Sequence, residues 1–272
     1  MTLGLMTILA HPDDETFGIA GTFKQATDHG RRVAVVCATR GEQGEIANPA
    51  LATQATLGQV REQELRNACA AVGVTDVNFL DYIDGHLPEV DVNEAVGRIV
   101  AQIRRFRPDV VITFAPNGIY GHVDHIKIHY LALDGVQAAA DAARYPELGA
   151  AHRVSKVYYA SPSREVMLEM RNRTSPDFLP GGNAATITIE EMGVPQSDLT
   201  TYVALTDEEL AAKMNAMKSH ATQMPADGPF NQNQGSEEMR QMMGTETFQL
   251  LPAPLSIRTF PTPETDVFAG LE

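Results

Sequence analysis

The sequence predicts an α/β fold: a Rossmann-like, mostly parallel sheet flanked by helices. Short apolar runs alternate with amphipathic segments from Leu5 to Ala143, and this alternation is typical of a doubly wound sheet. The residues best suited to chemistry directly follow apolar runs, and the carboxyl ends of parallel strands are where such sheets bind ligands. We expect a single domain over residues 1–272, with an irregular insertion at about 161–200 and a C-terminal arm from about 245.

Each expected strand is a short apolar run bounded by turn residues. These runs are Leu5–Ala10, Arg32–Thr39, Val77–Leu80, Val110–Phe114 and Val157–Ala160, with one more short strand around Phe248–Leu251. Amphipathic periodicity predicts the helices between and after them. The expected helices are a first one on Phe17–Phe23, then Gln59–Val72, Val92–Arg107, about Val123–Ala143, and Asp207–His220 with Thr206 as N-cap. Arg40–Gly58 and Met224–Gly244 are expected to be loops.

Composition narrows the class of protein. The chain has 272 residues and a formal net charge of −14, which argues against nucleic acid and anionic membranes as partners because phosphate contacts need a basic surface. Its two cysteines, Cys37 and Cys69, lie in apolar segments and are expected to be buried thiols, not a disulfide. No run is long enough to span a bilayer and no basic leader is visible. We therefore expect a cytoplasmic protein.

The first chemical motif follows the first expected strand. His11 stands at the strand end, and Pro12, Asp13, Asp14 and Glu15 come directly after it. His11 and Asp14 are three positions apart, so both can bend toward one point, and an imidazole with a carboxylate suits a zinc-like ion. The alternative is an ordinary helix start with an acidic cap. One cap needs one carboxylate, however, and three acids in a row favour the site.

A second motif lies in Ala115–Tyr130, after the fourth expected strand. Adding one of its histidines to the first motif would give three ligands and an open position, the layout of a catalytic zinc. His122 and His125 are spaced i, i+3, and His125 and His129 are spaced i, i+4. This spacing does not decide which of them is the ligand.

The remaining groups of a hydrolase are also present. Asp13, adjacent to an expected ligand, is the first candidate for a general base. His122 and Tyr120 are candidates for stabilising an oxyanion.

Taken together, these segments resemble the LmbE-like, PIG-L-type family of zinc-dependent N-acetylglucosaminyl de-N-acetylases, which includes mycothiol and bacillithiol pathway deacetylases and mycothiol-conjugate amidases. The first family motif is intact at His11–Asp14, whereas the second, His122–His125, has Val123 where proline is usual. The resemblance covers roughly residues 5–130 and 206–224. Its other segments are TRGEQGE, VREQELRNACAAVGV, RPDVVITFAPNGIYGH and KMNAMKSHATQM.

The resemblance implies one Zn²⁺ per chain, held by His11, Asp14 and His125. It implies that Asp13 is the general base and that His122 acts on the oxyanion or on the leaving amine. Two further roles follow: Tyr120 would help to hold the oxyanion, and Asp124 would orient a histidine.

The resemblance also implies substrate-binding positions at Arg61, Asp84, Glu45 (or Glu42) and His220. For Arg61 a solvated helix face is an equal alternative, because its helix is amphipathic with Arg61, Glu62, Glu64 and Arg66 mostly on the polar side. For His129 we prefer packing or support of a ligand over direct metal binding.

The function that follows is zinc-dependent removal of an N-acetyl group from an N-acetylglucosaminyl substrate. One alternative is cleavage of a larger amide in a thiol–sugar conjugate, or tailoring of a natural-product glycoside. An alternative of another class is a non-catalytic module that binds a sugar or a nucleotide, although the first turn is acidic where a phosphate would sit. The expected partner is a small amino sugar, and the family suggests a homo-oligomer.

Overall fold

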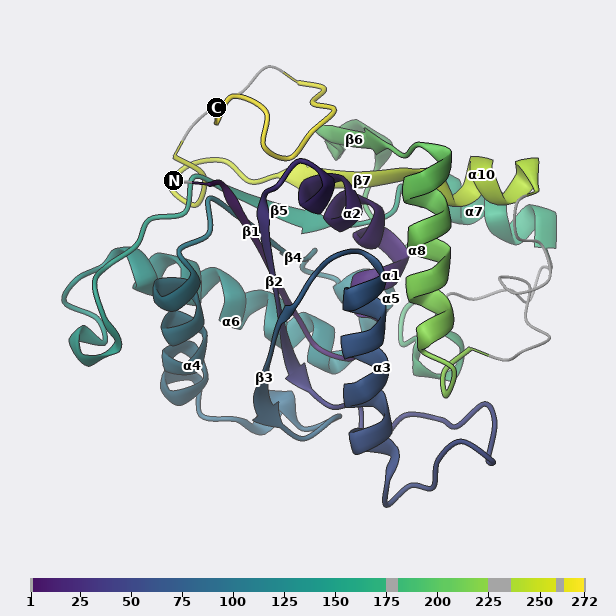
Figure 1. Cartoon of the computed structure of the whole chain (residues 1–272), viewed down its shortest axis with the longest axis horizontal. Coiled ribbons are helices and arrows are strands. Elements are labelled where there is room, and N and C mark those ends of the chain that lie inside the picture. The colour runs from purple at the N-terminus through teal and green to yellow at the C-terminus, as the bar shows by residue number, and fades with distance from the viewer. Residues whose placement is uncertain (1, 175–180, 225–235, 258–261, 272) are drawn as a thin grey trace. The chain divides into compact units, whose positions relative to one another are not determined.

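The computed structural model describes residues 2–174, 181–224, 236–257 and 262–271. The chain forms two compact units (Figure 1). The first contains Met1–His86 and Ala204–Glu246, and the second contains Leu87–Val203 and Thr247–Glu272. None of the helices in these described ranges is long and apolar enough to cross a membrane. The organisation as a single domain stays a prediction.

The first unit is built on three parallel strands in the order β3-β2-β1. Their bounds are Gly4–Leu9 for β1, Arg32–Thr39 for β2 and Asp76–Tyr82 for β3. All of β1 and nearly all of β2 are buried, as expected for parallel strands that are covered on both faces. The carboxyl ends of β1 and β2 lie at the same edge, because Leu9 pairs with Cys37 in register.

Helices of the first unit pack around α8 (Asp207–Ser219), which contacts both α2 (Ala20–Asp28) and α3 (Leu57–Ala71). Figure 1 shows α3 and α8 running side by side. Helix α8 begins at a capping box in which Thr206 and Glu209 satisfy each other's backbone N–H groups, as the acidic first turn predicts. The unit also contains α1 (Asp14–Gly18) and α10 (Glu237–Met243).

The second unit has the strand order β4-β5-β7-β6. Strands β4 (Val110–Phe114) and β5 (Lys156–Ala160) are parallel, whereas β7 (Thr245–Leu250) runs antiparallel to β5. Strand β6 is Thr201–Ala204. The fold is therefore α/β and mostly parallel, as predicted.

Its helices are α4 (Val92–Phe106), α6 (Val123–Ala140), α7 (Arg164–Thr174) and the short turn α5 (Gly118–Gly121). Helix α4 packs against α6. The 3₁₀ turns are η1 (Leu87–Glu89), η2 (Pro146–Leu148), η3 (Gly182–Ala184) and η4 (Gln196–Asp198).

The expected strands and main helices are confirmed, with most bounds shifted by a residue or two. The single helix expected on Phe17–Phe23 is instead two helices, α1 and α2, because Ile19 between them is not helical. Three further expectations were wrong or incomplete. Helix α10 lies where a loop was expected over Met224–Gly244, because its Met239 and Met243 are buried; residues 225–235 lie outside the described residues. The expected irregular insertion contains α7, and β6 was missed.

The expected polar face of helix α3 is only partly exposed to solvent. Arg61 and Glu64 are buried, not solvated, while Arg66 stays exposed. Burial is tolerated because both charged groups are bonded: Glu64 accepts the backbone N–H and the hydroxyl of Thr222 at 2.8 and 2.6 Å. Cys37 and Cys69 are buried free thiols, as predicted.

A buried carboxylate fixes the start of α2. Glu246 accepts the backbone N–H groups of Gly21 and Thr22 at 2.9 and 2.7 Å and the hydroxyl of Thr22 at 2.7 Å. Lys213 of α8 lies 2.9 Å away and neutralises it. A carboxylate at a helix N-terminus satisfies N–H groups that have no partner within the helix. This contact ties α2, which follows the first motif, to α8.

We predict that Glu246→Ala lowers the free energy of unfolding by about 3–5 kcal/mol, because it leaves the buried ammonium of Lys213 unpaired. Urea unfolding measures the change. The control is Asp28→Ala, which removes an exposed ion pair with Lys24 and should change stability by only about 0.3–0.5 kcal/mol. Equal losses in the two variants would contradict this interpretation.

Candidate active site

The first motif forms the turn between β1 and α1. The carboxylate of Asp14 accepts the N–H groups of Ala10 and His11 at 3.1 and 2.7 Å, so it closes the turn back onto the strand end. Asp13, at the N-cap position of α1, has a φ of 114° and caps nothing with its side chain. The side chains of Asp13 and Asp14 therefore do not act as an ordinary N-terminal cap of α1.

Around His11 the first unit gathers imidazole and carboxylate. Nδ1 of His11 lies 3.8 Å from Asp14 Oδ2 and its Nε2 lies 3.0 Å from Asp84 Oδ1, all three side chains being buried. Asp84 also accepts the N–H of Gln43 at 3.1 Å. Burial opposes ionisation of Asp84, but its bonds to His11 and the Gln43 N–H hold its pKa below the usual value. The group is thus an anionic neighbour of His11.

Arg61 reaches into the same turn from α3. Only 3% of it is exposed, so the alternative of a solvated helix face is wrong. It donates to the carbonyl oxygens of Gly41 and Pro12 at 2.9 and 2.6 Å, and to Asp13 Oδ2 at 3.1 Å. Burial raises the pKa of Asp13 to about 6, against the opposing effect of Arg61. A carboxyl group that titrates near neutrality is suited to proton transfer.

His220 and Glu45, the other residues of this unit expected to bind substrate, differ in their exposure to solvent. His220 has no exposed surface and its Nε2 lies 2.7 Å from Glu15 Oε1. Burial lowers the pKa of His220, but the Glu15 carboxylate outweighs this and raises it overall. Glu45 is exposed in the segment between β2 and α3. Substrate binding by His220 and by Glu45 stays a prediction.

The second motif orients its histidines from the start of α6. His122 is the N-cap of α6, and its Nδ1 accepts the N–H of Asp124 at 3.2 Å. His125 is buried; its Nδ1 lies 3.2 Å from the carbonyl oxygen of Gly118, and its ring stacks on Phe114 at 4.1 Å. A ring that donates from Nδ1 carries its lone pair on Nε2, the arrangement typical of a metal-ligating histidine.

His129 lies one turn further along α6. It is buried, its Nδ1 lies 2.8 Å from the carbonyl oxygen of Phe114, and burial lowers its pKa. It is therefore a neutral ring packed against β4. Asp124 is also buried and accepts the N–H of Leu87 at 3.1 Å, and its role in orienting a histidine stays a prediction.

Tyr120 contacts the segment at about 161–200, which the sequence analysis expected to be an irregular insertion. Its hydroxyl lies 3.4 Å from Nε2 of His125, and its carbonyl oxygen accepts the N–H of Thr186 at 3.0 Å. Thr186 also donates its hydroxyl to the carbonyl oxygen of Gly121 at 2.7 Å. A Cβ on Gly181 would come within 2.5 Å of the tyrosine ring, so glycine permits this close approach. Sequence periodicity carries no signal for these contacts.

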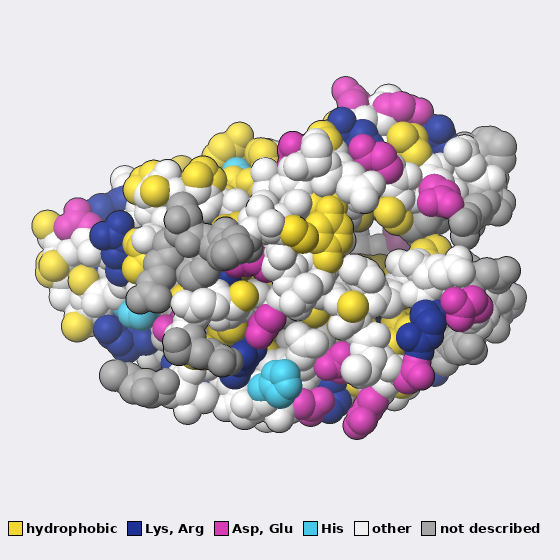
Figure 2. Space-filling view, turned by 90° about the horizontal axis from the view of Figure 1, so that it is seen from above, with side chains coloured by type: hydrophobic (Ala, Val, Ile, Leu, Met, Phe, Trp, Pro, Cys, Tyr) yellow, Lys and Arg dark blue, Asp and Glu magenta, His cyan; other side chains and the backbone are white. Residues whose placement is uncertain are grey.

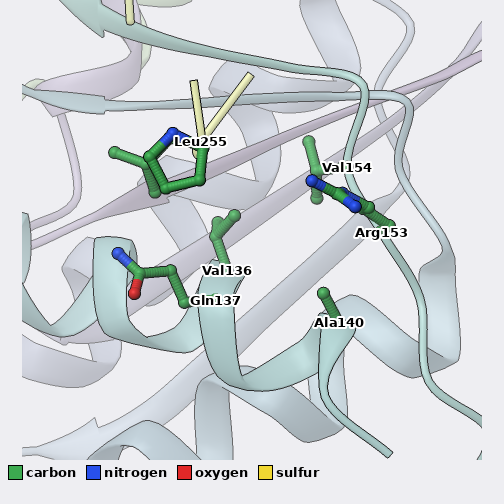
Figure 3. A pocket seen from close by; sticks show the side chains of 7 residues that line it. Val136, Gln137, Ala140, Arg153, Val154 and Leu255 are labelled. Carbon is green, nitrogen blue, oxygen red and sulfur yellow. The ribbon is translucent and has the colours of Figure 1, made fainter. Parts of the chain in front are cut away.

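A separate hollow of about 190 Å³ lies in the second unit between α6 and the segments around Arg153 and Leu255 (Figure 3). Its lining is mostly aliphatic, with Gln137 and Arg153 as the larger polar side chains (Figure 3). None of the residues expected to do chemistry lines it.

On the face in Figure 2, Lys and Arg side chains are scattered among Asp and Glu, in line with the acidic composition.

Comparison with known proteins places this arrangement in a family. The family model of the GlcNAc-PI de-N-acetylases, PIG-L, matches residues 6–136. A 1D-myo-inositol 2-acetamido-2-deoxy-alpha-D-glucopyranoside deacetylase of Geodermatophilus obscurus is 34% identical over 292 residues, covering 98% of this chain and 97% of the relative. The chain belongs to the PIG-L family.

Two other members of the comparison bear on the fold and on the range of reactions. A mycothiol S-conjugate amidase of Streptomyces coelicolor is 33% identical over 298 residues, covering 99% of this chain and 97% of the relative. The structure of N,N'-diacetylchitobiose deacetylase from Pyrococcus horikoshii matches with a TM-score of 0.67 at 20% identity, over 92% of this chain and 84% of the other. This PIG-L family chain therefore has the α/β fold of a solved deacetylase.

We predict that Arg61→Lys lowers the free energy of unfolding by about 1–3 kcal/mol, because an ammonium cannot reach all three oxygens that the planar guanidinium bonds. Thermal and urea unfolding measure this. Arg66→Lys, an exposed change on the same helix, should stay within about 0.5 kcal/mol of the wild type. An unchanged free energy of unfolding in Arg61→Lys would show that these hydrogen bonds contribute little to stability.

Proposed function

We propose that this PIG-L family chain is a zinc-dependent hydrolase that removes the acetyl group from an N-acetylglucosaminyl substrate. The observation that carries the proposal is the divergence of two neighbouring carboxylates. Asp14 turns back beside His11, whereas Asp13 turns to Arg61. One acid is thereby available as a ligand and the other as a base. The relatives' names supply the substrate class.

We assign one ion to His11, Asp14 and His125. The donor set fits zinc, which prefers imidazole nitrogen and carboxylate oxygen. His11 and His125 are buried, and the side chain of Asp14 is only 7% exposed. The Nδ1 contact of His125 with the Gly118 carbonyl orients the ring, as the hydrogen bonds behind zinc-bound histidines do. When bound, the ion would act as a Lewis acid on the amide carbonyl and lower the pKa of a water molecule.

The chain's own residues would then carry the protons and the charge. Asp13, with a pKa of about 6, takes the proton of the water that adds to the amide carbon. The hydroxyl of Tyr120 and the ring of His122 donate to the oxygen on which negative charge develops. The C–N bond breaks as the proton taken by Asp13 passes to the leaving amine, and acetate and the free amino sugar leave. Arg61 keeps Asp13 oriented through this cycle.

Hydrolysis of a larger amide is the second candidate. The amidase relative is about as similar as the deacetylase relative, at 33% against 34% identity, so identity alone does not choose between the two reactions.

We place the enzyme in the cytoplasm, where its free thiols Cys37 and Cys69 would stay reduced.

The test of the function is a panel of amides given to the zinc-loaded protein. We expect release of acetate from N-acetylglucosaminyl-inositol, with a lower kcat/KM for N-acetylglucosamine oligomers and for a thiol–sugar conjugate. Preferential cleavage of the conjugate would support the second candidate. Sugar binding without turnover, by a protein that binds no metal, would support a non-catalytic module instead.

Asp13 and Asp14 can be separated by matched substitutions. We predict that Asp13→Asn keeps its zinc while kcat falls by roughly 10²–10⁴-fold, the usual contribution of a general base. Asp14→Asn should weaken zinc binding itself, as should His125→Ala, whereas His129→Ala should keep the metal. Zinc content by mass spectrometry and turnover are measured on the same samples. Loss of zinc from Asp13→Asn, or from His129→Ala but not His125→Ala, would reverse the assignments.

A further inference from the structure

Glu15 is a buried carboxylate that the proposed reaction does not use. Its Oε2 accepts the backbone N–H of Asp13 at 2.9 Å, and its Oε1 accepts from Nε2 of His220 at 2.7 Å. Both side chains are almost completely buried. Glu15 therefore bridges the turn that carries the proposed base and the segment that follows α8, 205 residues away in the sequence.

Asp13 needs such support because of its backbone. Its φ of 114° lies in a region that residues with a Cβ rarely adopt, and such a conformation persists only when the surroundings impose it. Its N–H is bonded to Glu15, and its carbonyl oxygen accepts the N–H and the hydroxyl of Thr16 at 2.9 and 2.8 Å. Contacts on both sides of the residue thus fix the direction of the side chain, which points to Arg61.

We propose that Glu15 and His220 are a positioning pair: the imidazole holds the Glu15 carboxylate, and the carboxylate holds the backbone of Asp13 in its left-handed conformation. The proposal rests on the proposed role of Asp13 as the base. A carboxylate suits the place of Glu15, since it offers an acceptor to each donor, whereas an amide offers one acceptor and one donor and would need the other tautomer of the His220 ring, in which Nε2 accepts. Beside the Glu15 carboxylate, His220 donates from Nε2.

Two other roles for the pair give different results. In the first, the pair does no more than anchor the segment after α8. Glu64 also anchors this segment, by accepting the N–H and the hydroxyl of Thr222. Glu64→Ala is therefore a matched control: it removes a buried carboxylate of α3 that bonds the same segment at Thr222, away from Asp13. Alternatively, His220 could itself transfer a proton. His220→Gln separates the two roles, because its amide can donate near the place of Nε2 but cannot shuttle a proton.

The experiment measures kcat, KM and zinc content of the zinc-loaded full chain. We expect Glu15→Ala and His220→Ala to lower kcat by about 10²-fold, the effect of a misplaced catalytic group, with KM and zinc content unchanged. His220→Gln should recover most of the rate, and Glu64→Ala should keep it. An equal loss in Glu64→Ala, or in His220→Gln and His220→Ala alike, would overturn the proposal, as would loss of zinc.

A second measurement does not depend on activity. Glycine adopts a positive φ without strain, so in an Asp13→Gly background the metal-free protein should lose less stability on Glu15→Ala than the wild type does. A double-mutant cycle by urea unfolding measures this coupling, and strict additivity would overturn the proposal. Absence of turnover in the wild type, with coupling present, would instead contradict the proposed function and leave the positioning pair standing.

Discussion

The carboxylate of Asp14 determines the local structure on which the proposed site depends. By accepting the N–H groups of Ala10 and His11, it ends β1 and bends the chain into α1 within a few residues. The bend brings His11 beside Asp14 and turns Asp13 toward Arg61. One hydrogen-bonded turn thus separates the proposed ligand carboxylate, Asp14, from the proposed base carboxylate, Asp13, although the two residues are neighbours in the sequence.

Buried charges surround this turn, and each is paired. Arg61 bonds three oxygen atoms, Glu15 bonds His220, and Glu246 bonds Lys213 and the start of α2. Charged groups that leave water are tolerated only with such partners. The pairs link α1, α2, α3 and α8 of the first unit, so the turn has a rigid surrounding. In the second unit, Thr186 holds the backbone at Tyr120 by donating to the carbonyl oxygens of Tyr120 and Gly121.

Local patterns were sufficient to predict most of the fold. Apolar runs such as Arg32–Thr39 and the capping box at Thr206 carry their signal within a few residues. Local patterns could not predict that Arg61 points to Asp13, 48 positions away, or that Glu15 contacts His220, 205 positions away. Helix α10 was missed because a short segment rich in Met and Gln has little periodicity of its own. The residues proposed for chemistry came from the motifs at the strand ends, and their individual roles stay predictions.

The central proposal is that His11, Asp14 and His125 hold one zinc ion. Diffraction from crystals of the zinc-loaded protein, recorded on both sides of the zinc absorption edge, tests it most directly. We predict one anomalous peak per chain within about 2.0–2.2 Å of a nitrogen of each histidine and an oxygen of Asp14, with Asp13 outside ligand distance. A peak bound by Asp13 or by His129 in place of these residues, or no peak at this turn, would contradict the account.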